Sequence, residues 1–143
     1  MEQDKLELKD CLLRLEQAKE LNVLGVDGKD SLYIYGEDKT GDREPLCLTL
    51  RSDIISALSD VEMAFDLTCT LTDTEIIKML PKEIDNYQLK IIPFNEGYCV
   101  EYELYMEHSV YVTKDGSTLD FCRPILRDAL FEMIKCLKIN KLI

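Results

Sequence analysis

The sequence predicts an α+β fold, in which helices pack on one face of antiparallel sheet, as one sheet or two. Three observations support this class: apolar residues recur at helical spacing in several segments, they alternate with period 2 in several others, and no low-complexity linker divides the chain. The predicted order of elements is α-β-β-α-α-β-β-β-α. A length of 143 residues matches the commonest size of a single domain, so we expect one domain over residues 1–143.

The first segments carry the periodicity of a helix and then of a strand pair. Leucines recur at helical spacing over residues 3–21, which predicts a first helix. Leu and Ile alternate with Tyr over residues 32–35, and three leucines take every second place over residues 46–50. Alternation of this kind is typical of half-buried strands, so these two segments are predicted to form a strand pair.

Two helices are predicted next. Ser52 is a suitable N-cap, and apolar side chains follow it at helical spacing as far as Phe65. The residues Thr-Asp-Thr-Glu at 72–75 form a capping box, in which the first hydroxyl accepts from a backbone amide and the glutamate bonds back to the cap. The helix that follows is expected to end near Leu80, because Pro81 cannot continue it.

The last part of the chain predicts three strands and a final helix. The strands are expected over residues 87–94, 98–105 and 110–113, and the helix over residues 121–137, with Pro124 in its first turn, where a missing amide proton is tolerated. Both halves of the chain should bury apolar residues against one sheet system. The expected buried residues are Leu8, Leu12, Leu58, Phe65, Ile125, Ala129 and Met133.

The distribution of charge is the most informative feature of the chain. The formal net charge is -11 and the pI about 4.5. Six carboxylates and no Lys or Arg lie between Ser52 and Ile77, and four more lie in a second stretch without basic residues, between Lys90 and Lys114. Direct binding to nucleic acid or to an anionic membrane is therefore not expected, because both need clustered Lys and Arg. No apolar run approaches the roughly 18 residues that a membrane span needs.

The six cysteines are expected to be unpaired. No two of them form a CxxC motif, and they fall on apolar-periodic positions of the predicted elements. Met1 leads directly into Glu2, Gln3 and Asp4, without a signal peptide. We therefore expect reduced cysteines that contribute to the core of a cytoplasmic protein.

Candidates for catalysis and metal binding are few, and each has a simpler explanation. His108 is the only histidine and falls in a predicted turn, where an exposed side chain is expected. Cys122 lies beside Arg123 near the start of the last predicted helix, but its place on the apolar stripe favours a core residue over a nucleophile. The acidic residues between 27 and 44 lack the register of a calcium loop. We therefore expect no enzymatic activity, no metal and no cofactor.

The tyrosines all fall in predicted strands, and alternation should direct several of them to one surface. If Leu32, Ile34, Val100, Leu104 and Val112 face the helices, the opposite face is rich in Tyr and Glu, and tyrosine is enriched in protein interfaces. The alternatives are that the first helix covers this face or that it is an ordinary outer face. The outward set is Tyr33, Tyr35, Cys47, Thr49, Glu101, Glu103, Tyr105, Tyr111 and Thr113.

The segment Asp-Phe-Cys-Arg-Pro-Ile-Leu at residues 120–126 resembles the end of certain small phage or prophage proteins. In that group a strand pair leads by a short turn into a final helix that opens with an Ile-Cys-Arg-like triplet. The resemblance covers residues 98–137, and Phe121 and Pro124 depart from the pattern. It implies an origin in a mobile genetic element and brings no catalytic residues with it.

The function expected from these observations is binding to another protein that has a basic surface. Inhibitors of host nucleic-acid-handling defence systems, of the anti-CRISPR or antirestriction type, and toxin-immunity proteins are two versions of this class. The alternatives are a ligand-binding or small enzymatic domain with a site assembled from scattered residues, and a homodimer or larger homo-oligomer. The residues expected to bind are Tyr33, Tyr35, Asp60, Glu62, Asp66, Glu101, Glu103, Tyr105 and Tyr111.

Overall fold

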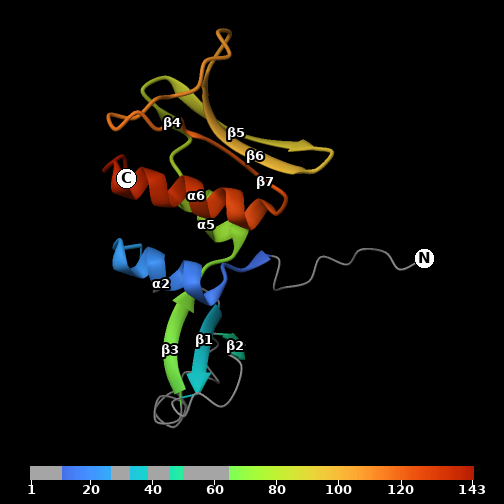
Figure 1. Ribbon diagram of the computed structural model, residues 1–143, viewed down its shortest axis with the longest axis vertical. Helices are drawn as coiled ribbons and strands as arrows, with labels where there is room; N and C mark the ends of the chain where they lie inside the picture. The colour runs from blue at the N-terminus through green and yellow to red at the C-terminus, as the bar shows by residue number, and fades with distance from the viewer. Residues whose placement is uncertain (1–10, 27–32, 39–45, 50–64) are drawn as a thin grey trace, which may run out of the picture. The chain divides into compact units, whose positions relative to one another are not determined.

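The computed structural model describes residues 11–26, 33–38, 46–49 and 65–143 of the chain (Figure 1). The described residues form three helices and two antiparallel sheets, which confirms the α+β class. Backbone contacts divide them into two compact units, one within residues 12–72 and one that contains residues 73–143. The single domain expected over residues 1–143 stays a prediction.

The first unit contains one helix and a three-stranded sheet. Helix α2 is Leu15–Val23, and strands β1 (Tyr33–Asp38), β2 (Leu46–Thr49) and β3 (Phe65–Thr70) form the sheet in the order β2-β1-β3. The predicted pairing of β1 with β2 is confirmed, with Ile34 opposite Leu48. On its other side, β1 pairs with β3.

The helix expected over residues 3–21 is interrupted at residues 12–14, and helix α2 starts at Leu15; residues 3–10 lie outside the described residues. Leu12 forms a bridge with Thr72, and the amide of Leu13 donates to the carbonyl of Leu71 at 3.0 Å. The amide of Arg14 then donates to Oε1 of Gln17 at 2.9 Å, which satisfies a donor at the start of α2. The leucines at positions 12 and 13 are thus held by strand-like contacts.

The expected second helix lies almost wholly outside the described residues. Only its last residue, Phe65, is described, and that residue begins β3 rather than ending a helix. The following helix, α5 (Asp73–Met79), is where the capping box predicts it, and it ends before Pro81 as expected.

The second unit is built on a four-stranded sheet in the order β4-β5-β6-β7. Strand β5 has the predicted bounds, and helix α6 packs on β6 and β7 (Figure 1). A two-residue turn at Asp85 and Asn86 joins β4 to β5, and both residues have positive φ, as a type I′ hairpin turn requires. The elements are β4 (Glu83–Ile84), β5 (Tyr87–Phe94), β6 (Gly97–Leu104), β7 (Asp120–Arg123) and α6 (Leu126–Ile139).

Two predicted boundaries in this unit are wrong. The expected strand at residues 110–113 is reduced to isolated bridges at Val110 and Val112. The final helix begins at Leu126 and not at Phe121, because residues 120–123 pair with β6 as β7. Four residues cannot distinguish a helical stripe from a strand by their pattern alone, and the pairing with β6 decides the outcome.

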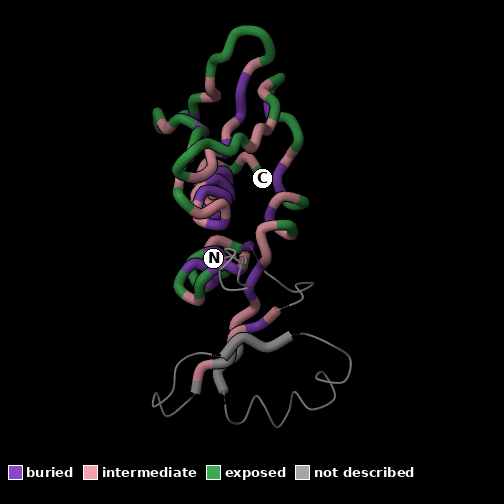
Figure 2. The backbone as a smooth tube through the Cα atoms, turned by 90° about the vertical axis from the view of Figure 1, so that its right-hand side faces the viewer, coloured by how far each residue is buried: buried purple, intermediate pink, exposed green. Residues whose placement is uncertain are grey.

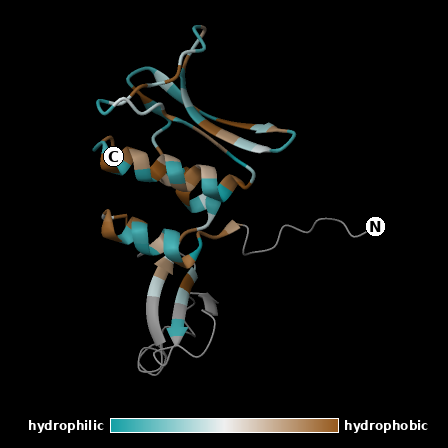
Figure 3. Cartoon of the chain, in the orientation of Figure 1, coloured by the Kyte–Doolittle hydropathy of each residue, from teal (hydrophilic) through white to brown (hydrophobic). Residues whose placement is uncertain are grey.

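The core of the second unit lies between α6 and the inner face of the sheet. Val100 and Tyr102 of β6 are fully buried, as are Ala129 and Met133 of α6. Figure 2 shows the buried residues gathered along α6, and Figure 3 shows hydrophobic and hydrophilic residues interspersed along that helix. The hydroxyl of Tyr102 donates to the carbonyl of Pro81 at 2.6 Å, so this buried polar group has a partner.

The expected core is confirmed in part. Leu12, Ala129 and Met133 are buried, whereas Ile125 is half-buried. Leu12 belongs to the unit with the three-stranded sheet and the other two to the unit with the four-stranded sheet, so the expectation of one sheet system is wrong. Leu8, Leu58 and the side chain of Phe65 lie outside the described residues.

Candidate functional site: the outer face of the four-stranded sheet

Strand alternation places a defined set of side chains on the face of the sheet opposite α6. Val100 and Tyr102 point inward, so Cys99, Glu101 and Glu103 point outward. The register between strands adds neighbours from β5 and β7. We call this surface the outer face; it consists of Lys90, Ile92, Phe94, Cys99, Glu101, Glu103, Asp120 and Cys122.

Glu103 is the most strongly held carboxylate of the outer face. Nζ of Lys90 lies 2.6 Å from Oε1 of Glu103, and Nδ1 of His108 lies 3.1 Å from the same oxygen. Hydrogen bonds from Lys90, then from Glu101 and His108, lower the pKa of Glu103 to about 2. Although sequence alternation correctly places Glu103 on the face opposite the core, it is buried there and not exposed.

Glu101 has the opposite electrostatic environment. Desolvation raises the pKa of Glu101, and its hydrogen bond with Glu103 and the nearby charges of Glu103 and Asp120 raise it further. Asp120 stands directly opposite Glu101 on β7. The positive charge of Lys90 only partly offsets these effects, since the ammonium group bonds to Glu103.

A disulfide joins Cys99 to Cys122 on the outer face, which corrects the expectation that all six cysteines are unpaired. The two residues are directly opposite on β6 and β7, with Cα atoms 4.0 Å apart. The amide of Tyr102 donates across to Leu119, so even-numbered residues of β6 point their backbone groups toward this edge. Cys99 and Cys122 are consequently a non-hydrogen-bonded pair, the kind in which opposite side chains come closest.

The disulfide also changes the interpretation of Cys122. The sequence placed this residue on the apolar stripe of a helix, whereas it is exposed in β7. Cys136, in contrast, is a free thiol on α6, and burial raises its pKa, which argues against a nucleophilic role.

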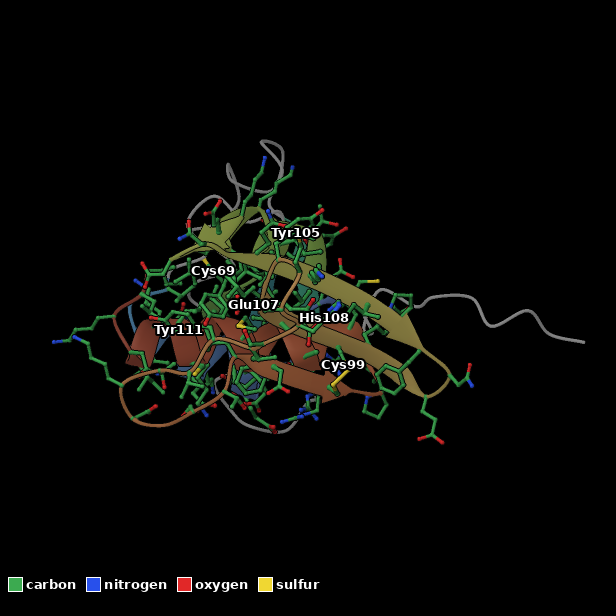
Figure 4. All side chains as sticks on the ribbon, turned by 90° about the horizontal axis from the view of Figure 1, so that it is seen from above. Cys69, Cys99, Tyr105, Glu107, His108 and Tyr111 are labelled. Atoms are coloured by element: carbon green, nitrogen blue, oxygen red, sulfur yellow. A yellow bond between two sulfur atoms is a disulfide. The ribbon has the colours of Figure 1, made fainter. Side chains whose placement is uncertain are left out.

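The loop after β6 presents two large apolar side chains beside the outer face. Tyr105 and Met106 are 68% and 79% exposed. The amide of Leu104 donates to the carbonyl of Ser109 at 2.8 Å, which closes the loop at its base. His108 adds a second tie through Glu103, and its side chain is otherwise exposed, as predicted. Tyr105, Glu107 and His108 are labelled in Figure 4.

Met106 and His108 have φ angles of 70° and 54°, a left-handed backbone conformation that residues other than glycine rarely adopt. Such backbone conformations persist where the surrounding bonds fix them, and they concentrate at functional sites. The loop of residues 105–108 therefore holds Tyr105 and Met106 outward in a defined conformation.

Tyr111 lies beyond this loop and makes contacts of its own. Its hydroxyl donates to Oδ2 of Asp85 at 3.3 Å, and its ring meets that of Tyr87 edge to face with centroids 5.2 Å apart. Partial desolvation, followed by the charge of Asp85, raises the pKa of Tyr111. Tyr111 thus ties the segment after the loop to the β4–β5 turn.

The structure does not place all the expected binding residues on one sheet. Tyr33, Tyr35 and Asp66 belong to the first unit, where the hydroxyl of Tyr35 donates to the carbonyl of Leu13 at 2.9 Å. The four others that are described, Glu101, Glu103, Tyr105 and Tyr111, belong to the second unit. Asp60 and Glu62 lie outside the described residues, as does the side chain of Asp66.

Alternation also fails after β6. Thr113 was expected outward and Val112 inward, yet Thr113 is buried and Val112 is exposed. The regular strand ends at Leu104, and a turn at residues 105–107 breaks the parity. Six members of the outer face were not predicted there: Lys90, Ile92, Phe94, Cys99, Asp120 and Cys122. The strands predicted over residues 87–94 and 98–105 contained the signal for the first four of them.

Among the described residues, an open pocket of about 550 Å³ lies between the segment after β6 and the end of α6, where Tyr111, Asp115, Ile139 and Lys141 line it. One groove of about 190 Å³ runs beside α6, where apolar Phe121 and Ile139 lie next to Glu132 and Lys135. Among the described residues, no group of three or more His, Cys, Asp or Glu side chains is placed to hold a metal ion.

No described helix is both long and apolar enough to cross a bilayer. Comparisons of the chain with protein-family models, with curated proteins and with solved structures gave no match.

Proposed function

We propose that this chain acts by binding another protein, and that the loop of residues 105–108 and the adjoining outer face form the binding surface. The observation that carries the proposal is the outward placement of Tyr105 and Met106 on a loop closed by hydrogen bonds. Aromatic residues and methionine are enriched in protein interfaces, and a loop whose backbone is already held by hydrogen bonds loses little backbone entropy on binding.

The charge around this surface supports a basic partner. Between Lys90 and Lys114 the sequence contains four glutamates and no Lys or Arg, and these glutamates lie in or next to β6. Opposite potentials speed encounter and orient the partner, whereas like charges disfavour it. A nucleic-acid-handling enzyme is a protein of suitable charge. An inhibitor of such an enzyme, encoded by a phage, or an immunity protein against a basic toxin is the form of this function that we propose.

The test compares capture by the immobilised chain with capture by a loop variant. We expect the double variant Tyr105→Ser, Met106→Ser to capture at least tenfold less of the partner from host extract than the parent chain does. Mass spectrometry identifies the captured partner. Ile139→Ser is the matched control, because Ile139 is also exposed but lies at the end of α6. Equal capture by all three proteins would overturn the proposal that this loop binds.

A further inference from the structure

We infer that the outer face binds an extended segment of a basic protein in which an arginine and an apolar side chain stand two residues apart. This inference rests on the proposed function and names the chemistry of the partner. It follows from the division of the outer face into an apolar half and an acidic half, which lie two residues apart along the strands.

The apolar half is formed by Ile92, Phe94 and the disulfide. Ile92 and Phe94 are 42% and 44% exposed, although both belong to the regular strand β5. Ile92 stands opposite Cys99, which stands opposite Cys122, so these residues form one row across three strands. Such a patch lies next to solvent, and covering it removes apolar area from water.

The acidic half is the neighbouring row, in which Lys90, Glu101 and Asp120 stand opposite one another. The ammonium group of Lys90 is bonded to Glu103, in the next row. Within the described part of the chain, no ion pair joins Glu101 or Asp120 to a cation. Asp120 accepts from the hydroxyl of Thr118 at 2.7 Å through Oδ1, and Glu101 bonds to Glu103. Each carboxylate has a second oxygen with which it can accept from a positive side chain from outside.

Arginine fits the two carboxylates better than lysine does. Its guanidinium is planar and offers several donors, so it can bond to two acceptors at once, and it is less strongly hydrated than an ammonium group. The row of Ile92 is two residues along the strands from the row of Lys90, which is about 7 Å. A partner with an apolar side chain at about this distance from the arginine would cover both halves together.

A second copy of the chain is a poorer occupant. The chain has a net charge of -11, and the acidic half would face a surface of the same sign. The matched occupant is therefore a basic protein and not this chain itself.

The inference can be tested with a peptide probe, acetyl-Ser-Leu-Ser-Arg-Ser-amide, titrated into the isotopically labelled full chain and followed by NMR. We expect saturable shifts of backbone amides in residues 90–94, 99–103 and 120–122. Replacing arginine by lysine in the peptide should weaken binding severalfold, and replacing it by citrulline or leucine by serine should weaken it at least tenfold.

Variants of the chain provide the second arm. Glu101→Gln with Asp120→Asn should weaken the peptide at least tenfold and reduce capture of the partner from extract, whereas Glu132→Gln on α6 should change neither. If the double variant binds the peptide and captures the partner as well as the parent does, while the loop variant loses capture, this inference is wrong and the proposed function stands. If neither variant affects capture, both are wrong. Concentration-dependent shifts of the same amides without peptide would show a second copy as the occupant and overturn the inference.

Discussion

Lys90 bonds to Glu103, which lies diagonally across from it, and not to Glu101, which stands directly opposite. Nζ of Lys90 is 2.6 Å from Oε1 of Glu103, whereas the strand register pairs Lys90 with Glu101. Two glutamates on one face of β6 therefore have pKa values displaced in opposite directions. The ionised form of Glu103 should therefore stabilise the fold, whereas the ionised form of Glu101 should destabilise it.

We expect Glu103→Gln to destabilise the chain at pH 7 and to matter less as the pH falls. The hydrogen bonds from Lys90, Glu101 and His108 lower the pKa of Glu103 from 4.5 to about 2. Its contribution is fully present above pH 4.5 and is lost as the pH falls toward 2. Urea unfolding of both proteins at several pH values checks this. A loss that stays constant from pH 7 to pH 3 would contradict the assignment.

Glu101→Gln should have the opposite effect. Because the pKa of Glu101 is raised in the folded chain, its ionised form destabilises the fold at pH 7. The glutamine removes that charge and retains an amide that can donate to Glu103, so the variant should be more stable than the parent at pH 7. The advantage should vanish below pH 4, where the parent is protonated as well. Urea unfolding of the parent and the variant at the same pH values measures this difference in stability. A variant less stable than the parent at pH 7 would contradict the claim that burial and the neighbouring carboxylates raise the pKa of Glu101.

The disulfide predicts a specific pattern of cysteine labelling. Alkylation under denaturing, non-reducing conditions should leave Cys99 and Cys122 unlabelled, with their peptides recovered joined together. Cys136 is the internal control and should be labelled in the same sample. After reduction, both cysteines should take the label. Full labelling of Cys99 before reduction would instead support the unpaired state that the sequence suggested.

The core of the second unit can be tested on a single helix. Met133 is fully buried, so Met133→Ala should lower the free energy of unfolding by roughly 2–5 kcal/mol. Ile139→Ala lies on the same helix at an exposed position and should change it by less than about 0.5 kcal/mol. Chemical denaturation measures both, and similar effects at the two positions would show that the faces of α6 are misassigned.

Local sequence patterns were sufficient to predict the bounds of elements whose conformation depends mainly on their own residues. The strand predicted over residues 87–94 has the bounds of β5, and the capping box at residues 72–75 predicted the start of α5. They failed where a distant partner decides. Leu12 and Leu13 fit a helical stripe, but their contacts with residues 71 and 72 hold them in a strand-like segment.

The candidate site was predictable only in part for the same reason. Alternation correctly set Glu101 and Glu103 opposite the core residue Val100. It could not show that the loop after β6 returns over Glu103, or that residues 120–123 form a strand. The disulfide and the pairing of Glu101 with Asp120 both depend on that strand, so the sequence offered no signal for either.

The bond between Cys99 and Cys122 encloses residues 100–121, which include the loop that presents Tyr105 and Met106. A protease that cut the chain inside this exposed loop would therefore not separate the two products, and β6 and β7 would stay linked in register. The enclosed segment can also change in length or sequence while the ends that anchor it stay fixed. Exposed loops diverge readily, and here the covalent link would let the loop of residues 105–108 diversify without releasing the sheet that supports it.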